Sequence, residues 1–84
     1  MEGKKMIKSL QRYNQFNTHE MLVLIEDVSY TKSAFGVNES GDIVFFNSRL
    51  VSKMDIDIGD EINAHCIPNY EDKRDIVKWR CISV

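Results

Sequence analysis

Short apolar segments separated by turn residues dominate the chain from Met21 onward, and this pattern constrains the fold more than any other feature. The segments are rich in aliphatic, β-branched and aromatic residues and have the length and composition expected of strands. They cover residues 21–30, 34–37, 42–46, 61–67 and 76–84. The breaks between them contain polar residues or glycine, as in the tip of a predicted hairpin at 38–41. The pattern predicts a small all-β domain.

The arrangement of these strands indicates a particular all-β architecture. Alternation places one apolar face on the fourth strand, formed by Ile62, Ala64 and Cys66. A polar stretch at 47–53 follows the third strand and precedes the fourth, and it is long enough for one helical turn or a loop. Five short strands with one such interruption predict a five-stranded Greek-key barrel of the OB type over residues 21–84.

Residues 1–20 form an extension with a different character. A brief apolar stripe at helical spacing predicts a short helix or an irregular segment there, and it consists of Met6, Ile7, Leu10 and Tyr13. The extension lacks the continuous apolar stretch of a secretory signal, and no run in the chain approaches the roughly 18 to 20 residues that span a bilayer. We expect one soluble, cytoplasmic domain, because 84 residues have room for a single core. Frequent lysine, isoleucine and asparagine are typical of AT-rich genomes, as in many bacteria and their phages.

The net charge of −2 is unevenly distributed along the chain. Residues 1–20 carry +2, residues 21–62 carry −5 and residues 63–84 carry +1, which together give −2. Any contact with a polyanion is therefore expected at the two ends of the sequence. The acidic total argues against tight binding of a polyanion by charge alone.

The sequence contains no recognisable arrangement of catalytic or metal-binding residues. Cys66 and Cys81 lack the CxxC spacing of zinc sites, so they are expected to be buried free thiols, with a cross-strand disulfide left open if their strands pair. His19 and His65 complete neither a ligand set nor a nucleophilic triad. The acids between 55 and 61 lack the spacing of a calcium loop and are expected in a solvated turn. No cofactor, metal or catalytic residue is predicted.

Residues 21–84 resemble the cold-shock domain in the order of their segments. The matching segments are Phe35-Gly36-Val37, the DIVFF strand at 42–46 followed by Ser48-Arg49-Leu50, and Ile58-Gly59-Asp60-Glu61-Ile62. In that family a GFGFI-like strand precedes a DVFVHFSAI-like strand and an L-x-x-G-D-x-V step. The resemblance implies that unpaired bases of RNA or DNA stack on side chains of the second and third strands, with basic residues at the margins. Val37 departs from the family, which has a second exposed phenylalanine there.

Alternation along the third strand selects the side chains that would contact bases. If Ile43 and Phe45 face the core, Val44 and Phe46 face outward, and Phe35 stands at a stacking position of the family. The predicted binding residues are Phe35, Phe46, Tyr30, Lys32, Tyr70, Lys78 and Arg80. Each ring also has a structural interpretation, because Phe35 and Phe46 would equally fill a small core and Trp79 is expected in the core or at the barrel rim.

The sequence therefore predicts a non-enzymatic protein that binds single-stranded RNA or DNA with little sequence preference. The alternative is an OB-fold protein-interaction module that uses its acidic middle or an exposed strand edge. No membrane partner is expected, and the sequence leaves the oligomeric state open.

Overall fold

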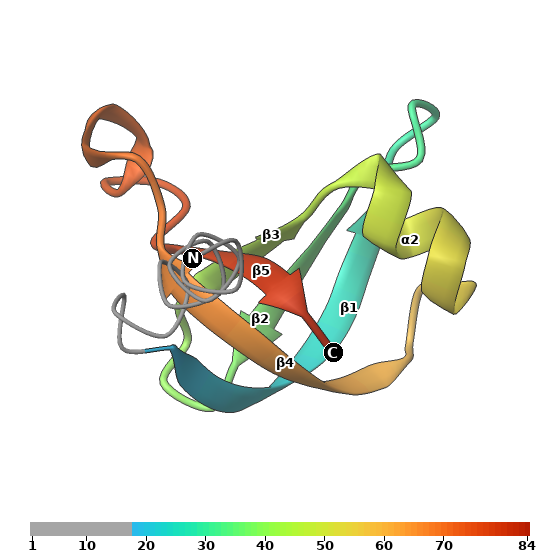
Figure 1. Cartoon of the computed structure of the whole chain (residues 1–84), viewed down its shortest axis with the longest axis horizontal. Helices are drawn as coiled ribbons and strands as arrows, with labels where there is room; N and C mark the ends of the chain where they lie inside the picture. Colours follow the sequence, from blue (N-terminus) through green and yellow to red (C-terminus); the bar gives the residue numbers. More distant parts are fainter. Residues whose placement is uncertain (1–17) are drawn as a thin grey trace, which may run out of the picture.

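The computed structural model describes residues 18–84, which form a closed barrel of five strands (Figure 1). The strands are β1 (His19–Val28), β2 (Ala34–Asn38), β3 (Ile43–Phe46), β4 (Glu61–Pro68) and β5 (Trp79–Ser83). Around the barrel they follow the order β1-β2-β3-β5-β4, and β4 pairs again with β1. Only the β3–β5 pair is parallel. The predicted all-β, OB-type barrel is confirmed.

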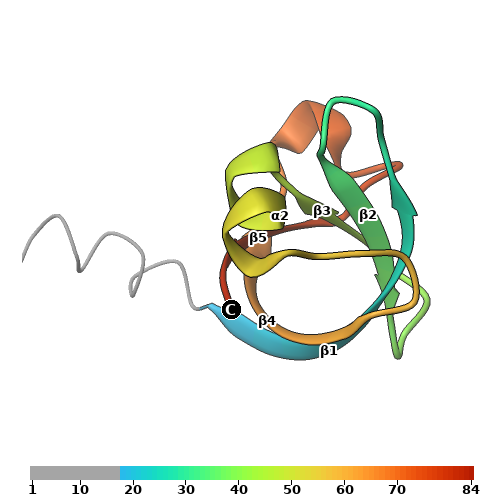
Figure 2. The same cartoon turned by 90° about the vertical axis from the view of Figure 1, so that its right-hand side faces the viewer.

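The long strand β1 closes the barrel because it pairs with two neighbours, β4 and β2. Its first half pairs with β4 and its second half with β2, and the register with β2 shifts between Ile25 and Asp27. Such an irregularity bends a strand and increases its twist. The backbone of Ile25 bonds instead to the turn before β4, where its N–H donates to the Asp60 carbonyl at 2.9 Å and its carbonyl accepts from Gly59 at 2.8 Å. Figure 2 shows β1 and β4 curving together around one side of the barrel.

A short helix, α2 (Ser48–Met54), connects β3 to β4 at one end of the barrel. Asn47 begins the helix, because its side-chain oxygen accepts a hydrogen bond from the Leu50 N–H at 2.9 Å. Asp55 ends the helix in a left-handed conformation. Val51 and Ile56 are buried against the barrel core. The interruption predicted at 47–53 is thus one helix, seven residues long.

The β2–β3 hairpin shows that the predicted faces of β3 were wrong. Val44 and Phe46 have no exposed surface and belong to the core, whereas Phe45 is only partly buried on the outer face. Gly36 fixes this orientation, because a side chain there would collide with Val23 and with the Leu24 carbonyl inside the barrel. Gly36 pairs with Val44 across the hairpin, so Val44 also faces inward.

Two element boundaries also differ from the prediction. β1 begins at His19, inside the stretch assigned to the extension. β5 begins at Trp79, because Ile76 and Val77 both donate their N–H groups to the Lys73 carbonyl and stay in the turn that follows η1 (Glu71–Lys73). The predicted helical stripe at 6–13 lies outside the described residues. No helix within residues 18–84 has the length and hydropathy needed to cross a bilayer.

Candidate functional site

Two aromatic rings and a guanidinium form a row across three neighbouring strands on the outer face of the barrel. Phe35 of β2 pairs with Phe45 of β3, and Phe45 pairs with Arg80 of β5. The ring centroids of Phe35 and Phe45 lie 5.4 Å apart at an interplanar angle of 54°. All three side chains keep part of their surface exposed. We call Phe35, Phe45 and Arg80 the outer row.

The connection between β4 and β5, residues 69–78, forms a wall beside the outer row. Asn69 anchors this connection: its side-chain nitrogen donates to the Val77 carbonyl at 3.0 Å, and its side-chain oxygen accepts from the Tyr70 N–H at 2.9 Å. The Asn69 N–H also donates to the Lys78 carbonyl at 2.9 Å. Asn69 is almost fully buried, and its side-chain and backbone bonds together hold the start of the connection in one conformation.

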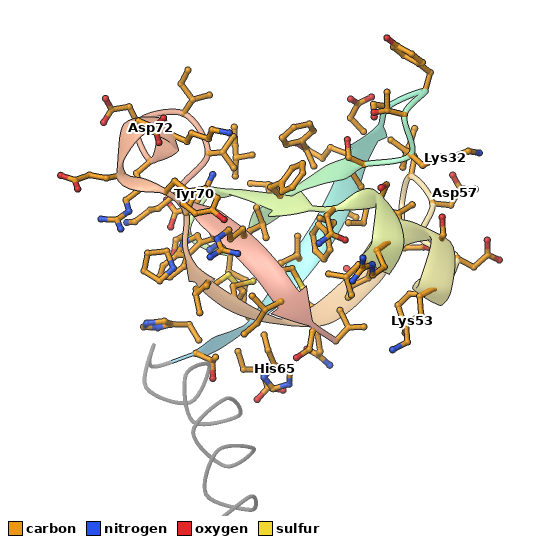
Figure 3. The ribbon with its side chains drawn as sticks, turned by 45° about the horizontal axis from the view of Figure 1, so that its top comes forward. Lys32, Lys53, Asp57, His65, Tyr70 and Asp72 are labelled. Atoms are coloured by element: carbon orange, nitrogen blue, oxygen red, sulfur yellow. The ribbon has the colours of Figure 1, made fainter. Side chains whose placement is uncertain are left out.

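Tyr70 connects this wall to the outer row. The Arg80 guanidinium carbon lies 4.5 Å from the centroid of the Tyr70 ring, a cation–π arrangement. The Lys73 nitrogen lies 6.0 Å from the centroid of the same ring. Figure 3 shows Tyr70 and Asp72 on the side of the barrel occupied by this connection, away from Lys32 and Asp57. Tyr70, Lys73 and Arg80 therefore lie together on one side of the barrel.

Between the outer row and the wall lies an open hollow of about 480 Å³. Its lining includes the outer row together with Tyr70, Asp72 and Lys73. Ligand sites combine apolar and aromatic walls with a few polar groups in this way, and this volume falls within their usual range. The hollow can accept a flat ring against its aromatic side chains and can offer hydrogen-bond donors at its basic edge.

Arg80 is the one side chain within residues 18–84 that has a buried nitrogen or oxygen atom without a hydrogen-bond partner. Its Nε is buried and has no hydrogen-bond partner. The only ion pair within residues 18–84 joins Lys78 to Asp42 at 3.9 Å, so no described carboxylate neutralises Arg80. A buried donor without a partner is costly, about 1 to 3 kcal/mol, and is uncommon in proteins.

The structure brings together three of the seven residues predicted for binding. Phe35, Tyr70 and Arg80 line the same hollow. Phe46 does not belong to this site, because its ring lies inside the core and cannot contact a base.

Tyr30 and Lys32 lie elsewhere, in the turn between β1 and β2. Tyr30 is 96% exposed, and Lys32 adopts a positive φ of 74° in the same turn. Lys32 lines a second hollow together with acidic side chains, Asp55, Asp57 and Asp60. Neither Tyr30 nor Lys32 lines the hollow beside the outer row.

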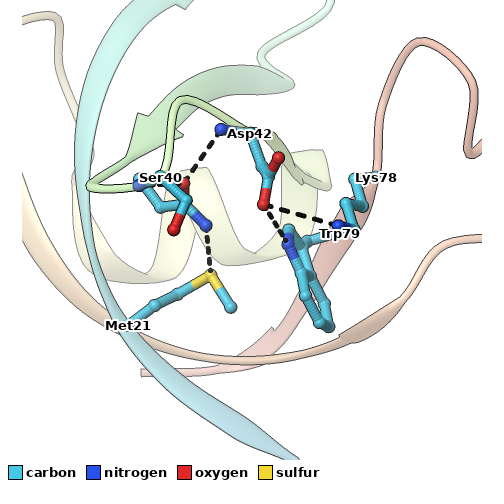
Figure 4. Close-up of polar contacts among 6 residues, drawn as sticks. Met21, Ser40, Asp42, Lys78 and Trp79 are labelled. Carbon is cyan, nitrogen blue, oxygen red and sulfur yellow. Dashed lines mark hydrogen bonds and ion pairs between the residues drawn. The ribbon is translucent and has the colours of Figure 1, made fainter.

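Lys78 lies at the barrel rim beside Trp79, outside the hollow. Its nitrogen lies 3.9 Å from Asp42 and 5.9 Å from the centroid of the Trp79 ring. The same Asp42 oxygen accepts a hydrogen bond from the Trp79 indole N–H at 3.2 Å, as Figure 4 shows. Trp79 packs against the core and lies 4.8 Å from the His19 ring, which confirms its expected place at the core or rim.

Phe45 is the functional candidate that the sequence prediction missed. All four residues of β3 are apolar, so alternation alone could not say which pair faces the core. The hairpin register was the available signal. Pairing around the tip of the hairpin places Phe45 opposite Phe35, and residues paired in this way lie on the same face of the sheet.

The acidic turn before β4 satisfies its own backbone. The Asp57 N–H donates to an Asp60 carboxylate oxygen at 2.8 Å, and the Ile58 N–H donates to Asp57 at 2.8 Å. These side chains are exposed, as expected of a solvated turn. Within residues 18–84 no cluster of three or more His, Cys, Asp or Glu side chains has a metal-binding arrangement.

The two cysteines face each other inside the barrel beneath the outer row. Cys66 of β4 pairs with Cys81 of β5, and both are buried free thiols, as predicted. The Cys81 thiol donates to the Ser83 carbonyl at 3.1 Å. A hydrogen bond to Cys81, together with burial, raises the pKa of the Cys66 thiol far above its ordinary value. Cys66 therefore stays protonated in the folded protein.

Comparisons of the chain with protein-family models, with curated proteins and with solved structures found no match.

Proposed function

We propose that this protein is a non-enzymatic, cytoplasmic protein that binds single-stranded RNA or DNA by stacking unpaired bases on the outer row. The observation that carries the proposal is the register of Phe35, Phe45 and Arg80, which gives three stacking surfaces on adjacent strands beside one hollow. Stacking accepts any base, because every base has a π-face. Each base stacked on an aromatic side chain contributes about 1 to 3 kcal/mol, which can offset a net charge of −2.

The position of the outer row in the fold supports the same proposal. OB-folds bind oligonucleotides over their second and third strands, and Phe35 and Phe45 lie on β2 and β3. The resemblance of residues 21–84 to the cold-shock domain points to these strands as well. Here the second ring comes from Phe45, while Val37 leaves the family's other β2 position without an aromatic side chain.

The distribution of charge suggests where the phosphates run. Arg80 and Lys73 line the hollow with one acid, Asp72, whereas three acids, Asp55, Asp57 and Asp60, lie with Lys32 around the second hollow. Acidic side chains repel a phosphate backbone, so the strand would cross the outer row toward Arg80 and Lys73 and avoid the acidic turn. Few phosphates would be contacted, and the affinity would fall gently with salt, with a slope of about −0.7 for each contact in a plot of log K against log salt.

Fluorescence anisotropy with labelled oligothymidylate and oligouridylate of about 12 nucleotides tests this function, since one OB-fold covers about 4 to 16 nucleotides. The titrations are run at about 50 and about 200 mM salt. Phe35→Ala and Phe45→Ala should each weaken binding by about 5- to 150-fold, the equivalent of losing one stacked base.

Tyr30→Ala is the matched control, because it removes an exposed ring that does not line the hollow. We expect its affinity to stay within about twofold of the wild-type value. Circular dichroism confirms that each variant is folded. The proposal is wrong if the wild-type protein shows no micromolar binding at low salt, or if folded Phe45→Ala binds as well as the wild type.

A protein-interaction module is the second candidate, and one observation favours it. Leu24, Val37 and Ile43 pair across β1, β2 and β3, and Leu24 and Ile43 expose 41% and 37% of their surface. Every strand within residues 18–84 has two neighbours, so this partner would use the apolar face instead of a strand edge. The oligonucleotide titration distinguishes the two candidate functions, because a protein-interaction module is expected to have no affinity for single-stranded RNA or DNA.

A further inference from the structure

The basic end of the outer row has the features of a base-selective contact. Stacking on Phe35 and Phe45 cannot distinguish bases well, because it uses only their π-faces. Arg80 differs from both rings, because a guanidinium donates hydrogen bonds in a fixed, planar fork. Within the outer row, Arg80 is therefore the residue that can distinguish bases by hydrogen bonds.

The guanidinium of Arg80 is held in place and pairs with no carboxylate of residues 18–84. The Tyr70 ring covers it at 4.5 Å, and Tyr70 is itself anchored through the buried Asn69. Its Nε has no partner, and no carboxylate within residues 18–84 pairs with its charge. Arginine in such a setting is preorganised for a planar ligand that supplies two acceptors.

A base stacked on Phe45 would bring its edge toward Arg80. The two residues are in register on paired strands, and neighbouring strands lie about 4.8 Å apart. A double-ring base has the length to cover Phe45 and reach the next strand, whereas a single ring covers less of that span. The hollow beside the row leaves space for this edge.

We propose that Arg80 selects guanine at this position, an inference that rests on the proposed binding of single strands. Guanine presents two adjacent acceptors, O6 and N7, on an edge that stays free while the base stacks, and this pair matches the arginine fork. Adenine replaces one acceptor with an amino donor, and thymine offers a single acceptor on the corresponding edge. Guanine occurs in both RNA and DNA, so Arg80 would make the same hydrogen bonds to O6 and N7 in either nucleic acid.

The test uses an oligothymidylate of about 12 nucleotides in which one central position carries guanine, adenine, cytosine or thymine. A parallel series in oligouridylate distinguishes RNA from DNA. We expect guanine to bind about 5- to 150-fold more tightly than adenine, the range of one bidentate arginine contact, and more tightly than cytosine. Inosine, which keeps O6 and N7, should bind like guanine, whereas 7-deazaguanine should bind like adenine.

Arg80→Lys is the decisive variant, because it keeps the positive charge and most of the stem but removes the fork. It should bind all four strands with similar affinity, while Lys78→Arg, at the rim outside the hollow, should keep the preference for guanine. Equal affinities of the wild-type protein for guanine, cytosine and adenine would overturn the inference, as would an undiminished preference in Arg80→Lys. If all strands bind equally and Phe45→Ala weakens all of them, only guanine selection fails; if none binds, the proposed function fails too.

Discussion

Phe45 and Phe46 are adjacent on β3 but lie in opposite environments. Phe46 has no exposed surface and contributes the largest fully buried side chain of the core. Phe45 lies on the outer face, in contact with Phe35 and beside the hollow. The same residue type therefore builds the core on one side of the sheet and the candidate site on the other.

The inner and outer faces of the whole β2–β3 hairpin differ in the same way. Its inner face carries small and medium side chains around one large ring, whereas its outer face carries Phe35, Val37, Ile43 and Phe45. The solvent face of an antiparallel sheet is normally polar. An outer face built of rings and aliphatic side chains does not serve the core and points to a ligand or partner.

The largest expected effect is on the inner face. Phe46→Ala should lower the free energy of unfolding by about 3 to 5 kcal/mol, because it leaves a cavity at a site with no exposed surface. Urea denaturation followed by circular dichroism measures this loss. A loss below about 1 kcal/mol would mean that Phe46 is not a core residue.

Gly36→Ala tests the orientation of the hairpin. The added methyl group would collide with Val23 and lie 2.7 Å from the Leu24 carbonyl oxygen, so the backbone itself would have to move. We expect a loss of about 1 to 3 kcal/mol in the free energy of unfolding. Ser40→Ala, exposed at the tip of the same hairpin, should change stability by less than about 0.5 kcal/mol. Equal stabilities of the two variants would place Gly36 on the outer face.

Cys66, a buried thiol of the barrel core, predicts that the stability of the protein depends on pH. The pKa of Cys66 is raised in the folded protein, so the unfolded chain releases this proton first as the pH rises. The free energy of unfolding should therefore fall as the pH rises above about 8.5, the ordinary thiol pKa. Urea midpoints at about pH 7.5 and about pH 9.5 measure the loss. Cys66→Ala should reduce this pH dependence; an unchanged dependence would contradict the assignment.

The outer face should contribute least to stability. A double-mutant cycle between Phe35→Ala and Phe45→Ala should give a coupling energy of about 0.5 to 1.5 kcal/mol in the free energy of unfolding, as expected of one aromatic pair. The measurement uses the same urea titrations. A coupling close to zero would show that the two rings do not form a pair in solution.

Much of the fold could be predicted from local sequence, because strand composition, turn residues and the Asn47 cap act over short distances. The faces of β3 could not be predicted by alternation, since Ile43 through Phe46 are all apolar. The pairing of Phe35 with Phe45 follows from the hairpin and was accessible.

The hollow was not accessible from the sequence. It depends on the 69–78 connection. This connection folds back beside β5 because Asn69, at its start, bonds to Val77 and Lys78 at its end. A sequence pattern identifies Tyr70 and Arg80 as aromatic and basic, but only the fold stacks them at 4.5 Å. The position of β3 between β2 and β5 then brings Phe45 into the same site.

The most direct test of the outer row is an NMR titration of isotope-labelled protein with an oligothymidylate of about 12 nucleotides. We expect the amide resonances of β2, β3, β5 and the 69–78 connection to shift, with the largest changes near Phe35, Phe45 and Arg80. The acidic turn around Asp57 and Asp60 should remain unchanged and serves as an internal control. Shifts confined to that turn, or no shifts at all, would contradict the assignment of the outer row as the binding site.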